Sequence, residues 1–290
     1  MTEEIWGLSA FTSSALGTPT HLSKLTMINL LWLYELPNWL FCCLVLAAFI
    51  GFALTGQLVV RRFLPRWYGD KDYNDIVGQF LSASGVFFGI TLGLLAVGAW
   101  ENYSAVDAAV TKEATNIGVL YRTVENYPEP HRTALTGQLR DYTRAEIDKA
   151  WPLQRKGQSA QAVGSAVLRA FSHQLTHIEP QGEAQKALHS EALRQFSNMI
   201  ESRRERLASV TTQLPPIVWS VVIGGTVLNL SLMWLFVVEN KRLHDLLTAI
   251  LACLLGLLVF LLAVMDFPFR GEFSVGPDSF EMVYDQLMKK

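Results

Sequence analysis

The chain has 290 residues, of which 24 are Lys or Arg and 26 are Asp or Glu, so its formal net charge is −2. Basic and acidic residues are interleaved and form no basic face of the kind that nucleic acid requires, which excludes nucleic acid as a partner. Hydrophobic residues make up 50% of the chain, and its mean hydropathy of +0.24 averages very apolar segments with ordinary polar sequence. The composition therefore indicates two environments within one chain.

Four uncharged apolar runs have the length of membrane-spanning helices. Each is close to the ~20 residues that a helix needs to cross the hydrocarbon layer. The runs are 37–60, 76–100, 216–238 and 246–265. We predict an all-α polytopic membrane protein with four transmembrane helices, so the lipid bilayer is its first partner.

The spacing of these runs divides the chain into five parts. A segment of more than a hundred residues separates the second run from the third, and we expect it to be an extramembrane helical bundle. The predicted parts are an N-terminal segment at 1–36, partly interfacial; transmembrane helices at 37–100; the helical domain at 101–213; transmembrane helices at 214–265; and a tail at 266–290 with a short amphipathic helix.

The helical domain reads as four helices joined by proline-containing breaks. Apolar residues recur every three or four positions after the second run, which predicts that its helix continues outward without interruption. The later domain helices are expected at 132–150, closed by Trp151-Pro152, and at 159–177 and 183–212. Pro215-Pro216 suits the first turn of the third membrane helix, and Pro277-Asp278 that of a tail helix. The tail's aromatic residues suggest packing either on the membrane surface or on the helical domain.

The basic residues in the short loops predict the orientation. Such residues favour the cytoplasmic side, whereas long domains cross largely regardless of charge. Two short loops carry them, with Arg61, Arg62, Arg66 and Lys71 in the first and Lys241 and Arg242 in the second. The helical domain is then expected on the periplasmic or external side of a bacterial cell membrane. The cluster Arg203, Arg204 and Arg206, just before the third run, argues for the opposite orientation.

The second run has a face of small residues. Gly78, Ser82, Gly85, Gly89 and Gly93 recur at three- and four-residue steps. Small residues let membrane helices approach closely, so helix packing is one interpretation. The other is that this face lines a pore, and both hold if copies of the chain meet around an axis.

Two polar residues near these runs are further candidates. Asn229 lies near the middle of the third run, where an unsatisfied amide is costly. We expect it to form a hydrogen bond across to another helix, with a backbone carbonyl freed near Gly224-Gly225 as one acceptor, or to contact a permeating ion. Glu101 follows the second run, at the membrane mouth. A charge at this height is usually solvated, and the alternative is that a ring of such carboxylates in an oligomer selects cations.

The remaining polar clusters predict surface rather than chemistry. His173 and His177 share a helical face, but the intervening glutamate of a metalloprotease helix is missing, so a solvated face and no metal site are expected. Arg203, Arg204 and Arg206 are interpreted as surface residues that meet lipid headgroups or pair with Glu201 and Glu205. No nucleophile elbow, phosphate loop or paired-cysteine motif is present, so we predict no enzyme activity, no catalytic residues and no cofactor.

The arrangement resembles a bacterial family of membrane proteins that carry a bestrophin-like domain. The resemblance extends over about 78–280 and rests on these pieces: Trp100-Glu101-Asn102, Glu113-Ala114, Tyr121-Arg122, Arg203-Arg204-x-Arg206-Leu207, Leu214-Pro215-Pro216-x-x-Trp219 and Asp266-x-Pro268-Phe269-x-Gly271. It implies a distant similarity to bestrophins, which are oligomeric anion channels. The acidic residues of the tail are spread out, so calcium ligation is not implied.

We therefore expect a homo-oligomeric ion channel or pore that conducts small inorganic ions passively. Similarity of fold does not by itself establish this activity. The alternative is a non-conducting membrane-anchored sensor or scaffold whose helical domain binds a partner.

Overall fold

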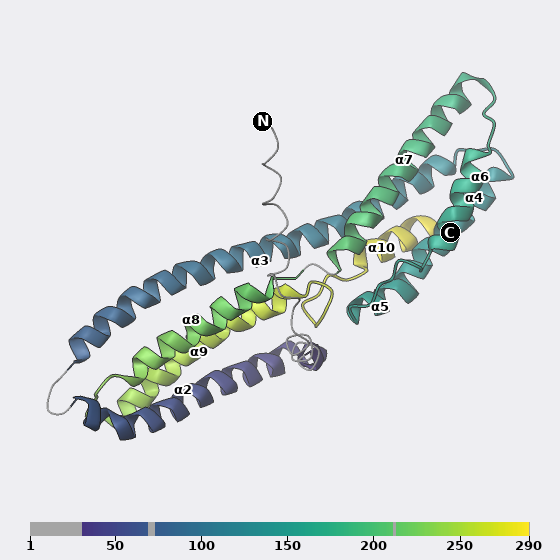
Figure 1. The fold of residues 1–290 in the computed structure, drawn as a ribbon. Coiled ribbons are helices and arrows are strands. Elements are labelled where there is room, and N and C mark those ends of the chain that lie inside the picture. Colours follow the sequence, from purple (N-terminus) through teal and green to yellow (C-terminus); the bar gives the residue numbers. More distant parts are fainter. Residues whose placement is uncertain (1–30, 69–72, 211–212, 290) are drawn as a thin grey trace, which may run out of the picture.

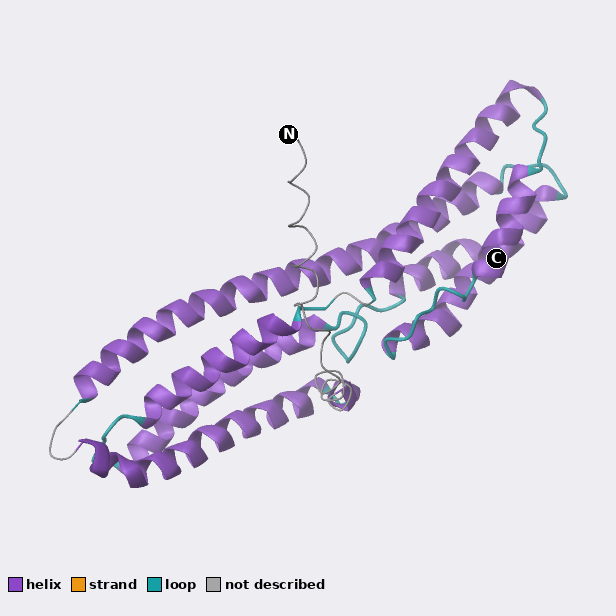
Figure 2. Cartoon of the chain, viewed as in Figure 1, coloured by secondary structure: helices purple, strands orange, loops and turns teal. Residues whose placement is uncertain are grey.

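The computed structural model describes residues 31–68, 73–210 and 213–289 (Figure 1). Throughout these ranges the chain forms helices and loops and no strand (Figure 2), which confirms the predicted all-α class. Lys71 and the side chain of Arg66, used above for orientation, lie outside the described residues. So do Thr211 and Thr212, at the predicted end of the last domain helix.

Four helices in the described ranges are long and apolar enough to cross a membrane. Their bounds are α2 Asn38–Tyr68, α3 Asn74–Val124, α8 Pro216–Trp234 and α9 Lys241–Asp266. In Figure 1, α8 and α9 run side by side between α2 and α3, and both of them contact each outer helix. The third predicted run ends four residues early because the helix stops at Trp234.

The extramembrane part is built on the second half of α3. This helix has 51 residues, which at 1.5 Å per residue makes it about 76 Å long. The other elements here are α4 His131–Ala145, a π-helical turn η2 Glu146–Ala150, α5 Trp151–Arg155, α6 Ser165–Thr176 and α7 Gly182–Ser209. The unbroken helix predicted to leave the second run is confirmed.

Two predicted boundaries in this part were wrong. The second domain helix does not close at Trp151-Pro152 but continues to Arg155. Proline lacks an N–H and is disfavoured inside an α-helix, but here the π turn η2 has already changed the bonding pattern just before it. The third helix starts at Ser165 instead of 159, because Gly164 adopts a left-handed conformation with φ of 69°.

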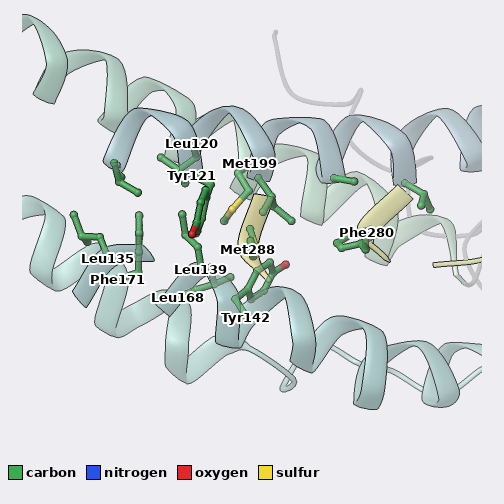
Figure 3. Close-up of a cluster of buried hydrophobic side chains, with 14 of the residues drawn as sticks. Leu120, Tyr121, Leu135, Leu139, Tyr142, Leu168, Phe171, Met199, Phe280 and Met288 are labelled. Carbon is green, nitrogen blue, oxygen red and sulfur yellow. The ribbon is translucent and has the colours of Figure 1, made fainter. Parts of the chain in front are cut away.

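The C-terminal tail packs on the helical domain. After α9 it forms α10 Asp278–Val283 and a π turn η3 Tyr284–Met288, which contact α3 and α4. Phe280 and Met288 are fully buried in the domain core, and Met288 lies between Tyr142 and Met199 (Figure 3). The sequence left two surfaces open for the tail, the membrane surface and the helical domain, and the tail packs on the domain. Before α2, residues Leu31–Glu35 form the 3-10 helix η1.

The membrane helices pack closely where glycine meets an aromatic ring. A Cβ atom placed on Gly225 of α8 would lie 2.3 Å from the ring of Phe88 on α3. One placed on Gly224 would meet nothing within 4 Å. The two neighbouring glycines thus differ in whether they face α3.

We expect Gly225→Val to destabilise the protein by about 1–3 kcal/mol, because the added atoms overpack the contact with Phe88. Gly224→Val is the matched control and should cost much less. The measurement is the thermal unfolding midpoint of both variants purified in detergent. Equal midpoints for the two variants would contradict the close approach of α3 and α8.

Candidate ion pathway along α3

The small-residue face of α3 is open in the protomer. A Cβ atom added to Gly85, Gly89 or Gly93 would meet no other atom within 4 Å. At the loop end the face is partly covered, since a Cβ on Gly78 would lie 3.8 Å from Phe236. The Ser82 hydroxyl is exposed but donates to the Gly78 carbonyl at 2.8 Å. The structure therefore gathers these five predicted residues on one helix and leaves most of that face without a partner.

A second open face of α3 carries large apolar side chains. Phe80, Phe87 and Leu94 are 65%, 74% and 70% exposed. A different side of α3 faces the other helices of the protomer, and it carries the buried residues Phe88 and Leu92. An exposed apolar face of this kind can be covered by lipid or by another copy of the chain.

Glu101 is exposed where α3 leaves its apolar segment. At 3.6 residues per turn it lies about 80° around the helix from Gly93. Trp100 stacks on Tyr103, with ring centroids 6.0 Å apart, and Tyr103 stacks on Phe273 of the tail at 5.1 Å. The mouth predicted at this level is thus bordered by one acidic side chain and a row of aromatic rings.

Asn229 is not on the open face. Its side chain is buried, and its amide donates to the Gly225 carbonyl at 2.9 Å, one turn earlier in α8. The acceptor is in the predicted Gly224-Gly225 region, but the predicted bond across to another helix was wrong, because the bond lies within α8 itself. A hydrogen bond to a carbonyl of the same helix satisfies the amide N–H without a partner from another helix.

Arg203 and Arg206 are buried in the helical domain, so their predicted surface location was wrong. Arg206 Nε lies 2.7 Å from Glu113 Oε2, and Arg206 Nη2 lies 2.7 Å from Glu146 Oε2. Arg203 forms an ion pair with Glu146 as well. Only Arg204 of the three is exposed. We call Glu113, Tyr142, Glu146, Arg203 and Arg206 the ionic cluster; it joins α3, α4, η2 and α7.

Aromatic side chains add further contacts to the ionic cluster, although Arg206 Nη1 is buried without a hydrogen-bond partner. The Tyr142 hydroxyl donates to Glu113 Oε1 at 2.7 Å and accepts from Arg203 at 2.7 Å. Burial, and then the charges of Glu113 and Glu146, raise the pKa of Tyr142 well above its usual value, so the phenol stays protonated. The Arg206 guanidinium also faces the rings of Trp151 and Phe280, at 5.5 and 5.4 Å from their centroids.

The protonation of Arg206 follows from the same neighbours. Burial lowers its pKa, but the charges of Glu113 and Glu146 outweigh this and leave the pKa above its usual value. The guanidinium is therefore a permanent charge, and together with Arg203 it balances the charges of the two fully buried carboxylates.

A signal for this burial exists in the sequence. Arg203 and Arg206 follow Ala192 and Met199 at helical spacing and so continue the apolar stripe of α7, whereas Arg204 does not. Charge on a core-facing stripe indicates a buried ion pair. The neighbouring arginine and glutamates concealed that signal.

Asp266, at the end of α9, is hydrogen-bonded to the first residues of α8 and to the segment just before it. Its carboxylate accepts from the Leu214 backbone N–H at 2.6 Å and from the Trp219 indole N–H at 2.9 Å. Leu214, Trp219 and Asp266 were noted above only as parts of a resemblance. Their physical role is to join the start of α8 to the end of α9.

The histidine pair does not gather further ligands. The rings of His173 and His177 stack with centroids 4.1 Å apart on an exposed face. Among the residues that the structure describes, no three of the His, Cys, Asp and Glu side chains are grouped as a metal site.

We expect Arg206→Met to destabilise the helical domain by about 3–5 kcal/mol, because Glu113 and Glu146 would stay buried without their shared cation. The exposed neighbour provides the control, since Arg204→Met should change stability by about 0.5 kcal/mol or less. Thermal unfolding of each full-length variant in detergent measures both. An unchanged midpoint for Arg206→Met would show that the ionic cluster does not hold the domain together.

Solved structures share this architecture. A point variant of a bacterial bestrophin homologue from Klebsiella pneumoniae superposes with a TM-score of 0.66 at 10% identity, covering 85% of this chain and 97% of that one. A second variant of that homologue gives 0.64 at 12% identity, with 82% and 95% covered. A structure described as a membrane protein gives 0.65 at 9% identity, with 85% and 97% covered. At these identities the likeness shows the fold.

The sequence comparison is more specific. No curated protein matches the chain. The Bestrophin-like domain family matches residues 47–280, a range that includes the open face of α3, the whole ionic cluster and the Asp266 link. Because this match covers well over half of the sequence, the chain belongs to the Bestrophin-like domain family.

Proposed function

We propose that the protein assembles with copies of itself around an axis and forms a passive pathway for small inorganic ions. The small-residue face of α3 lies next to that axis. The observation that carries the proposal is that this face is empty in the protomer although it runs through an apolar, membrane-spanning segment. Helix faces made of small residues let membrane helices approach closely. Most homo-oligomers have closed symmetry around an axis.

The family supports the same conclusion. Bestrophins, after which the family is named, are oligomeric anion channels, and the similar solved structures are of bacterial bestrophin homologues. A passive conduit needs no nucleophile, cofactor or metal, so the proposal is for a channel and not an enzyme.

We also propose that Glu101 lies at the mouth of this pathway, where a ring of carboxylates would favour cations over anions. The reversal potential in a salt gradient, compared with that of Glu101→Gln, checks this role.

We expect Gly89→Leu to abolish ion conductance while membrane insertion stays normal. A Cβ atom at this position meets no other atom within 4 Å in its own protomer, so an effect on current reports on what lies across the open face. Gly51→Leu is the matched control, because Gly51 lies on α2 and also has nothing within 4 Å of an added Cβ. Single-channel recording in planar bilayers measures both variants against wild type.

Normal currents from assembled Gly89→Leu protein would exclude this face from the pathway. Silence of the assembled wild-type protein across voltages and salts would instead favour the non-conducting sensor or scaffold. In that case the helical domain, with its own buried core, is the part that binds a partner.

We also propose that the helical domain lies on the periplasmic or external side, as the basic residues of the short loops indicate. The burial of Arg203 and Arg206 supports this, because two of the three residues that argued for the opposite side are paired with carboxylates inside the domain. A cysteine at exposed Gln181, with the three native cysteines replaced by alanine, should react with a membrane-impermeant maleimide on intact cells. Labelling only after the cells are opened would place the domain in the cytoplasm.

A further inference from the structure

A groove lies where the first and last membrane helices meet the helical domain. Its volume is about 590 Å³, within the range of small-ligand sites. The walls come from the segment before α2, from the end of α5, and from the residues after α9. Since α2 begins and α9 ends here, the groove lies at the level where the chain leaves the membrane.

The walls combine apolar and aromatic surface at this level. Leu36, Pro37 and Pro152 supply the apolar lining. Close by in the chain, Trp32 and Trp39 are 53% and 67% exposed. Exposed tryptophan at the end of a membrane helix is typical of the lipid headgroup region.

One of the two acidic residues of the groove is engaged. Glu272 accepts from the Asn38 backbone N–H at 3.0 Å, at the start of α2. Glu35 is exposed and forms no ion pair within the described residues. Burial lowers the pKa of Arg270, and the charge of Glu35 partly opposes this.

The basic residues are not engaged. Neither Arg155 nor Lys156 forms an ion pair with any carboxylate in the described part of the chain. Their backbone is held in place, because Arg270 donates to the Lys156 carbonyl at 2.9 Å and Gly157 turns the chain with φ of +68°. Two free cations thus stand on a fixed segment beside an apolar groove.

We propose that this groove binds the headgroup of an anionic phospholipid. The phosphate oxygens accept hydrogen bonds from Arg155 and Lys156, and the acyl chains extend along the outer surface of α2 beside Trp39. Arginine and lysine at the membrane surface recognise anionic headgroups in this way. The site is independent of whether α3 lines a conducting pathway.

The test compares phosphatidylglycerol with phosphatidylcholine as stabilisers of the delipidated full-length protein in detergent. The thermal unfolding midpoint, titrated with each lipid, gives the two apparent affinities. Wild type should prefer phosphatidylglycerol, and R155Q/K156Q should bind it about 30-fold more weakly, at ~1 kcal/mol for each basic residue. The control R169Q/K186Q removes the same charge from exposed positions on α6 and α7 and should keep the wild-type preference.

Equal affinity of wild type for the two lipids would overturn the proposal. So would phosphatidylglycerol binding that R155Q/K156Q leaves unchanged, because the lipid would then be held elsewhere. If phosphatidylglycerol binds only after residues 1–30 are deleted, the chain's own N-terminal segment is the occupant and the lipid assignment fails.

Discussion

The helical domain depends on one fully buried guanidinium. Arg206 has no contact with solvent, so its charge must be balanced within the protein. Glu113 on α3, Glu146 on η2 and the rings of Trp151 and Phe280 provide that balance. Each comes from a different part of the chain, so the fixed fork of the arginine sets the relative positions of α3, η2, α7 and the tail. The π turn fits this requirement because it is the element that presents Glu146.

This arrangement makes α3 the connection between the two environments. The helix is continuous from Asn74 to Val124, with Gly89 in its membrane half and Glu113 in its domain half. Helices bend sharply only at identifiable breaks, and its described length contains no proline. One helix thus carries both the small-residue face and the Glu113 carboxylate that binds Arg206. The Asp266 link binds α8 and α9 to each other near the same level.

The sequence was informative where the signal is local and regular. Length and the absence of charge were sufficient for the four membrane helices, and the three- and four-residue apolar steps showed that α3 continues outward. Pro277-Asp278 correctly indicated the tail helix. At Trp151-Pro152 the local rule failed, since proline was read as a stop and the preceding π turn has no sequence signature that we recognised.

The candidate functional site was harder to predict from the sequence than the fold, for a different reason. The five small-residue positions on α3 could be read from spacing alone, but whether they are open depends on which helices lie beside them. Arg206 and Glu113 are far apart in the chain, and no period in the sequence relates them. Asn229 was judged by the cost of an unpaired amide, but a carbonyl one turn away in its own helix was enough. The phospholipid groove is assembled from three distant segments, so it emerges only from the fold.

The position of Phe280 in the chain determines the order in which the protein can be completed. Synthesis proceeds from the N-terminus, so Glu113 and Glu146 leave the ribosome well before Arg206, and Phe280 follows only after α8 and α9. Until then one face of the guanidinium lacks its aromatic cover. The core of the helical domain is thus complete only after the tail has been synthesised. Its closure waits for the final membrane helix to be inserted, so a nascent chain arrested before the tail would carry an unfinished core.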